Sequence, residues 1–246
     1  MIGKLFCVAF DAPDHRALAR FYAALLDGEV VGDLSDWIAI RTPDGWRLGF
    51  QPAPDHVRPT WPSQQLPQQL HLDFQVPDPA EAARRAESLG AERVGGDGVQ
   101  LIVMTDPAGH PFCLCASEPA DPIRVFGACI DCPEPAALAP FYTGLLGLEV
   151  RYQGDDGAWL GGDGPMACLT FQGVDGYQPP DWPDPARPQQ VHLDVLVDDI
   201  DVAERQLLEI GGRPLPGDGE SWRVYADPAG HPFCLILDSE PAAKDA

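Results

Sequence analysis

The stretch Pro67-Gln68-Gln69-Leu70-His71-Leu72-Asp73-Phe74 returns later in the chain as Pro188-Gln189-Gln190-Val191-His192-Leu193-Asp194-Val195. Each copy leads, at the same distance downstream, into an identical nine-residue run, Asp-Pro-Ala-Gly-His-Pro-Phe-Cys-Leu, at 106–114 and at 227–235. Repeats of this length indicate an internal duplication. We therefore predict that the 246-residue chain forms two domains, 1–120 and 121–240, each large enough to bury its own core.

The composition restricts the class of partner. The chain carries 38 acidic and 16 basic residues, for a formal net charge of −22. Such a surface repels phosphate backbones and anionic membranes, because nucleic-acid affinity depends largely on Lys and Arg. No run reaches the roughly 18 apolar residues of a membrane span, and no signal-peptide pattern opens the chain. The seven cysteines follow strand periodicity, so we expect a reduced, cytoplasmic protein. We expect its partner to be a small molecule rather than nucleic acid or a membrane.

Each domain is predicted to contain two βαβββ units. In the first unit, a short apolar strand at 5–10 precedes a helix with Leu18, Phe21, Tyr22 and Leu25 at helical spacing, closed by Gly28. Short β-prone runs follow up to residue 51, broken by turn residues. The same plan recurs in all four units, which we place at 1–55, 66–118, 121–176 and 187–240.

Three further features qualify this plan. Pro140 lies inside the predicted third helix and should kink it unless the helix begins later. Trp61 and Trp182 lie in matching Pro-rich linkers, where they are candidates to line or cover a binding site. His110 and His231 lie in the repeated nine-residue run, where we expect their side chains to bond the turn backbone.

Together, the strand, the helix with its Phe-Tyr pair, the Pro43-Asp44-Gly45 turn, the His-Leu-Asp strand and the Asp-Pro-Ala-Gly-His turn resemble the vicinal oxygen chelate superfamily. The resemblance is closest to its glyoxalase-like and bleomycin-resistance-like branches and covers nearly the whole chain. It implies an α+β fold in which tandem βαβββ units curl their sheets into two cups, with helices outside. In metal-using members, the first and last strands of each unit supply the ligands of a divalent ion.

The resemblance places those ligand positions on specific residues. They fall on Cys7, Gly49, His71 and Cys113 in the first half and on Gly127, Thr170, His192 and Cys234 in the second half. Neither set contains the family's His and Glu combination, and neither offers a carboxylate to a hard ion such as Mg²⁺. Asp73 and Asp194 share a strand face with the histidines and are candidates to support them. We therefore expect no cofactor.

Two alternatives use the same residues. Cys7, His71 and Cys113 form a set that could hold Zn²⁺ or another divalent metal. Alternatively, His71 with Cys113, or His192 with Cys234, could act as base and nucleophile. Buried cysteine also serves as a small apolar filler, which is the simplest interpretation of these thiols.

Two classes of function remain open. The first is a binding protein whose metal-free cup holds a hydrophobic or aromatic molecule for sequestration, resistance or transport. The second is a lyase, isomerase or dioxygenase, either with an unusual metal site or with His71 or His192 as general acid or base. We expect a monomer with two pseudo-symmetric domains, with a dimer, or pairing of units across the halves, as alternatives.

Overall fold

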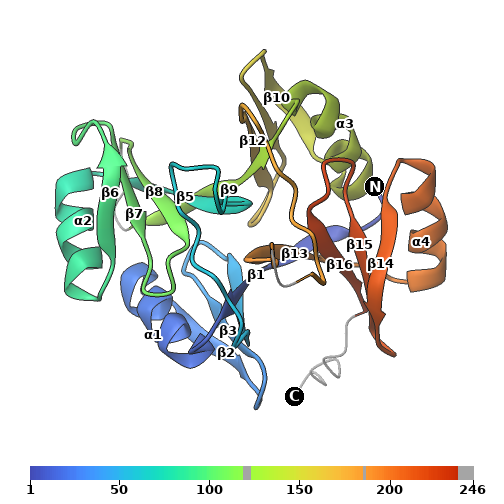
Figure 1. Cartoon of the computed structure of the whole chain (residues 1–246), viewed down its shortest axis with the longest axis horizontal. Coiled ribbons are helices and arrows are strands. Elements are labelled where there is room, and N and C mark those ends of the chain that lie inside the picture. The colour runs from blue at the N-terminus through green and yellow to red at the C-terminus, as the bar shows by residue number, and fades with distance from the viewer. Residues whose placement is uncertain (119–122, 185–186, 238–246) are drawn as a thin grey trace.

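The computed structural model describes residues 1–118, 123–184 and 187–237 and consists of two eight-stranded sheets and four helices (Figure 1). Sheet A contains, in spatial order, β14 (Arg213–Asp218), β15 (Trp222–Ala226), β16 (Pro232–Ile236), β13 (Val191–Leu196), β1 (Lys4–Ala12), β4 (Arg47–Pro52), β3 (Ile38–Arg41) and β2 (Glu29–Asp33). Sheet B contains β10 (Glu149–Gln153), β11 (Gly157–Gly161), β12 (Cys168–Gly173), β9 (Arg124–Cys132), β5 (Leu70–Val76), β8 (Pro111–Ala116), β7 (Leu101–Thr105) and β6 (Glu92–Gly96). The helices are α1 (His15–Leu26), α2 (Pro79–Ser88), α3 (Pro135–Leu146) and α4 (Ile200–Glu209).

The predicted fold class is confirmed, because the chain is a tandem α+β protein with four βαβββ units. Each sheet, however, joins one unit from each half. β1 of the first unit pairs antiparallel with β13 of the fourth, and β5 of the second unit pairs antiparallel with β9 of the third. Figure 1 shows both sheets running from the first half on the left to the second half on the right. The expected pairing of units within each half is thus wrong for the sheets, and the alternative across the halves is correct.

The boundary predicted between residues 120 and 121 lies outside the described residues, as does the end of the second domain near 240. The hydrophobic core nevertheless links the two units of each half. The Tyr22 hydroxyl of α1 donates to Asp106 Oδ2 over 3.0 Å, and Phe21 lies 6.2 Å from Phe112 between ring centroids. In the second half the Tyr142 hydroxyl makes the same bond to Asp227 over 2.9 Å. The Phe-Tyr pairs therefore dock each first helix onto the neighbouring unit.

The repeated nine-residue run forms a turn organised by its buried aspartate. Asp106 Oδ1 accepts hydrogen bonds from the backbone N–H groups of Ala108, Gly109 and His110. His110 Nδ1 lies 2.9 Å from Asp106 Oδ2, and the corresponding distance from His231 to Asp227 is 2.8 Å. Both histidines thus bond the aspartate of their own turn, and the expectation of a bond to the turn backbone is wrong.

The helix ends follow the predicted capping chemistry with one difference, at the end of α1, and Pro140 lies inside the third helix as predicted. Asp78 accepts from the N–H groups of Ala80 and Glu81, as an N-cap does. α1, however, ends at Asp27 in the left-handed conformation rather than at Gly28. α3 begins at Pro135, so Pro140 lies within the helix and cannot donate to Ala136 O, which accepts instead from Gln153 Nε2 over 3.5 Å.

No helix in the described part of the chain is long and apolar enough to cross a membrane.

Candidate functional site

The two sheets each present one face that carries the repeated His and Asp side chains. We call the face of sheet A that bears His192 and Asp194 cup A, and the face of sheet B that bears His71 and Asp73 cup B. Successive side chains of a strand point to opposite faces, and directly paired residues share a face. Because Ala9 pairs with both His192 and Gly49, and Asp194 pairs with Cys7 and Cys234, all of these residues belong to cup A.

Cup A contains a cavity of about 700 Å³. Its walls are aromatic, with Phe6 on β1, Trp37 before β3, Trp222 on β15 and Trp182 from the linker that precedes β13. The tip of the Trp182 ring lies against Gly217 of β14, where an added Cβ would approach it to 3.0 Å. Trp222 is 40 % exposed, although it is one of the largest apolar side chains of the molecule. The cavity therefore has several apolar ring faces that no other described side chain fully covers.

Polar groups gather at the floor of the same cavity. His192 Nε2 lies 3.5 Å from Asp194 Oδ1, and His192, Asp194 and Cys234 have donor atoms within 4.8 Å of one another. Burial disfavours a charged His192, but Cys234 and Asp194 favour it, and the pKa of the imidazole is raised above its ordinary value. Burial raises the pKa of the Cys234 thiol, which disfavours the thiolate that a nucleophile needs.

A buried carboxyl group completes this floor. Asp11 accepts from Gln51 Nε2 over 2.6 Å and from Gln189 Nε2 over 3.0 Å, and both glutamines border the cavity. Burial raises the pKa of Asp11, although His192 and the two amides oppose the shift. The Arg47 guanidinium also borders the cavity and lies 4.3 Å from the centre of the Phe6 ring. Cup A thus combines aromatic walls with one fixed cation and several hydrogen-bonding groups.

The family ligand positions in cup A do not fit a hard divalent ion. A Cβ built on Gly49 would lie 2.2 Å from Trp37 Cζ2 and 2.9 Å from Cys7 Sγ. The Trp37 ring and the buried Cys7 thiol therefore occupy the space in which a ligand side chain at position 49 would lie. The other positions offer His192 and the Cys234 thiol, without a carboxylate.

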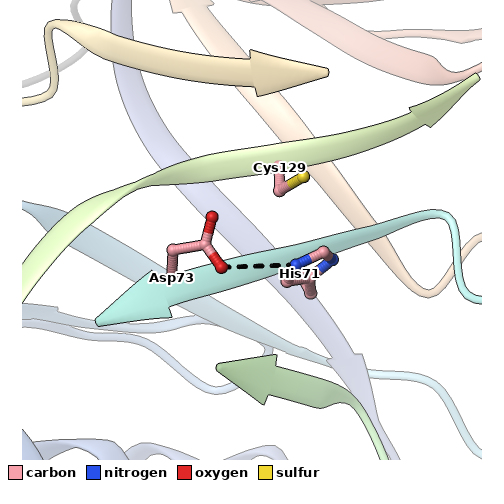
Figure 2. A group of neighbouring side chains, drawn as sticks. All are labelled: His71, Asp73 and Cys129. Atoms are coloured by element: carbon pink, nitrogen blue, oxygen red, sulfur yellow. Dashed lines mark ion pairs between the residues drawn. The ribbon is translucent and has the colours of Figure 1, made fainter. Parts of the chain in front are cut away.

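Cup B is built on the same plan with different residues. His71 Nε2 lies 3.4 Å from Asp73 Oδ1, and the Cys129 thiol of β9 lies beside both (Figure 2). On the other side of His71, the Gln68 amide lies 3.2 Å from Nδ1 and donates to the buried Asp131 over 3.0 and 3.1 Å. Thr170 pairs directly with Cys129, and Cys113 pairs with Asp73. The family positions in cup B also lack a carboxylate, so an ordinary Mg²⁺ or Mn²⁺ site does not fit there either.

The pairing across the halves corrects the predicted zinc set. Cys7 lies in cup A, whereas His71 and Cys113 lie in cup B, so these three residues cannot hold one ion. Cup A brings together five of the predicted site residues: Cys7, Trp182, His192, Asp194 and Cys234. Cup B brings together four others: His71, Asp73, Cys113 and Thr170. Trp61 lies against Gly95 of β6, the cup B counterpart of the contact between Trp182 and Gly217.

Several residues of the two cups were not predicted from the sequence as site residues. These are Phe6, Trp37, Arg47, Gln189 and Trp222 in cup A and Cys129 and Cys168 in cup B. Gln189 lay within the repeated stretch, and its recurrence was a usable signal. No such signal marked Trp37 or Arg47, because they share a cavity with His192 only when the first and fourth units share a sheet.

Comparisons with known proteins agree with this architecture. The family model described as the glyoxalase-like domain matches twice, at residues 7–115 and 127–236. Among solved structures, glyoxalase I from Zea mays is similar with a TM-score of 0.65 at 15% identity, over 95% of this chain and 92% of that chain. A putative dioxygenase from Bacillus subtilis subsp. subtilis str. 168 gives 0.64 at 14% identity, over 96% and 85%. At such identities the likeness shows the fold alone. A search among curated proteins found no match.

Proposed function

The chain belongs to the glyoxalase-like domain family, and from this premise we propose that cup A binds a small, flat aromatic or hydrophobic molecule without a metal ion, in a sequestering or carrier role. The observation that carries the proposal is the cavity of about 700 Å³ with aromatic walls. Small-molecule sites usually have volumes of about 300–1,000 Å³ and combine apolar walls with a few fixed polar groups. Cup A has both properties.

The arrangement of the aromatic side chains supports a flat ligand. Phe6, Trp37, Trp182 and Trp222 come from four separate segments of the chain and border one cavity. Stacked or edge-on aromatic pairs contribute about 0.5–1.5 kcal/mol each beyond the area they bury. A ring system held between several of these side chains would therefore gain both affinity and orientation. Trp182 comes from the linker and can act as a cover over the bound molecule.

The polar floor supports orientation of the ligand rather than chemistry upon it. Gln51 and Gln189 each donate to Asp11, and both residues border the cavity. Arg47 adds a positive charge on the wall, so a ligand with an electron-rich ring or an acidic group is favoured. A metal is unnecessary for this mode of recognition.

The experiment is a ligand screen with matched tryptophan variants. Aromatic compounds are titrated into the parent protein while tryptophan fluorescence and the thermal midpoint are followed. For any compound that binds, Trp182→Ala should weaken the affinity about two- to twelvefold, because an aromatic contact of about 0.5–1.5 kcal/mol is removed. The control is Trp61→Ala, the equivalent residue over cup B, which should leave the affinity unchanged. Equal losses in both variants, or a screen without a single binder, would contradict the proposal.

A second candidate function is metal-free catalysis, and the contact between His192 and Asp194 is the observation that favours it. The raised pKa of His192 suits a general acid that donates a proton to a bound molecule. Such an enzyme would show turnover of a compound that binds cup A, and His192→Gln would abolish turnover with little change in affinity. A carrier would return the compound unaltered.

A further inference from the structure

Cup B carries four cysteines around its His and Asp pair. Cys113 and Cys115 on β8 pair with Asp73 and Gln75 of β5, and Cys129 on β9 pairs with His71. Cys168 on β12 lies two residues before Thr170, which pairs with Cys129, so Cys168 faces the same side of the sheet. All four are free thiols.

Three of the donor groups already lie within reach of a single ion. His71, Asp73 and Cys129 each offer an atom within 4.8 Å of the other two (Figure 2). His71 and Cys129 are each only 5 % exposed, so their positions are fixed by packing. The Gln68 amide lies 3.2 Å from His71 Nδ1, which holds the ring with Nε2 directed toward Asp73.

We propose that cup B binds one thiophilic divalent cation, such as Zn²⁺, through His71 Nε2, Asp73 Oδ1 and Cys129 Sγ, with Cys113, which pairs with Asp73, as an additional thiol. Nitrogen, oxygen and sulfur donors in a three- or four-ligand set are those that Zn²⁺ prefers in proteins. His71 and Cys113 are family ligand positions, whereas Asp73 and Cys129 lie outside them, so the proposed ligand set differs from the family's in these two residues. The proposal is independent of ligand binding in cup A.

The comparison of the two cups explains why the cation belongs in cup B. Both repeats have a histidine on this strand. His71 pairs with Cys129 in cup B, whereas His192 pairs with Ala9 in cup A. The family ligand position on the last strand of the first or third unit is Gly49 in cup A and Thr170 in cup B. Two residues before it, cup A has Arg47 and cup B has Cys168. Cup A thus lacks both of these thiols, although it holds Cys7 where cup B has Gly127, and its Arg47 guanidinium repels a cation. Its group of His192, Asp194 and Cys234 is less suited to the same ion.

The test is a metal titration of the full chain. The protein is treated with a chelator under reducing conditions and titrated with Co²⁺, whose thiolate charge-transfer absorption reports Cys ligation, and Zn²⁺ is then added as competitor. We expect one Co²⁺ per chain, displaced by Zn²⁺. Cys129→Ala should weaken binding at least about tenfold, since even supporting residues of metal sites have effects of that size.

Asp73→Asn provides a second variant that keeps the shape of the side chain, in case Cys129→Ala fails to fold. It should also weaken binding, with an unchanged circular dichroism spectrum. The control variants are Cys234→Ala, in the corresponding group of cup A, and Cys132→Ala, a buried thiol outside both groups. Both should bind Co²⁺ as the parent does. The proposal is overturned if no thiolate absorption develops, if Cys129→Ala and Asp73→Asn bind as the parent does, or if Cys234→Ala abolishes binding.

Discussion

Substitution of Gly49 by alanine tests whether the Trp37 ring fills the family ligand position of cup A. An added Cβ would lie 2.2 and 2.3 Å from Trp37 Cζ2 and Cη2, and 2.9 Å from Cys7 Sγ. Carbon atoms pack at about 3.5–4.0 Å, so the indole must retreat by more than about 1 Å toward the cavity. Overpacking of this kind costs about 1–3 kcal/mol, and the gain of alanine over glycine in a strand offsets about 0.5–1 kcal/mol of that.

The double variant with Trp37→Ala isolates this contact. Without the ring, the two shortest contacts of the new methyl group are removed and the contact with Cys7 Sγ remains, so Gly49→Ala should cost about 1–2 kcal/mol less in the Trp37→Ala background than in the parent. The free energies of unfolding are measured by urea titration at one pH, with the slope of the transition checked for constancy. The same titration gives the coupling energy between the two positions.

Gly32→Ala is the matched control for this experiment. Gly32 also borders the cavity, but its added Cβ would lie 3.8 Å from the nearest atom, the Cβ of Ala39. We expect a change in unfolding free energy within about 0.5 kcal/mol. The reasoning is refuted if Gly49→Ala is no more destabilising than Gly32→Ala, or if its coupling to Trp37→Ala is within about 0.3 kcal/mol of zero.

Two further predictions concern the turn and the sheets. Burial disfavours the charged forms of His231 and Asp227, but their mutual attraction raises the pKa of His231 above 6.5 and lowers that of Asp227 below 3.8. The pair therefore stabilises the fold most between about pH 4 and 6.5, less as the pH rises through the raised pKa of His231, and less as it falls through that of Asp227. The stability difference between the parent and His231→Asn should follow this profile in urea titrations at successive pH values, and a constant difference from pH 5 to 9 would contradict it. Residues 1–118 and 123–237 produced as separate chains should co-purify as a complex, and a folded, monomeric half in size-exclusion chromatography with light scattering would refute the pairing across the halves.

Most of the fold could be predicted from the sequence, because many of the repeated residues are buried and join the two units of each half. The Phe-Tyr pair and the Asp-Pro-Ala-Gly-His turn are identical in both halves, and the structure joins them through the bonds from Tyr22 to Asp106 and from Tyr142 to Asp227. A hydrogen bond between buried groups allows little substitution, because a lost partner leaves the other group unsatisfied. Identity between the copies therefore marked the interior and the His and Asp pair of each cup, whereas the cup residues that come from the first and third units differ.

The pairing of units was harder to predict, because strands of the first unit can satisfy the same backbone hydrogen bonds with the second or the fourth. The lengths of the connections could have predicted which units share a sheet. The segments between β4 and β5 and between β12 and β13 comprise 17 residues each, and the segment between β8 and β9 comprises only 7. Long connections without regular structure are uncommon inside compact domains and suit a crossing from one sheet to the other. The short connection keeps β8 and β9 in one sheet.

The pairing across the halves also explains how one duplicated chain can present two unlike cups. The second and fourth units supply the shared set, His71 with Asp73 and Cys113 in cup B, and their equivalents in cup A. The first and third units supply what differs, namely Ala9, Arg47 and Gly49 in cup A against Cys129, Cys168 and Thr170 in cup B. A substitution in β1 or β4 thus alters cup A and leaves the polar set of cup B intact. In addition, a molecule bound in cup A as proposed would contact both β1 and β16, which border the cavity. Its binding would therefore stabilise the association of the first unit with the last, by an amount that grows with the ratio of ligand concentration to dissociation constant.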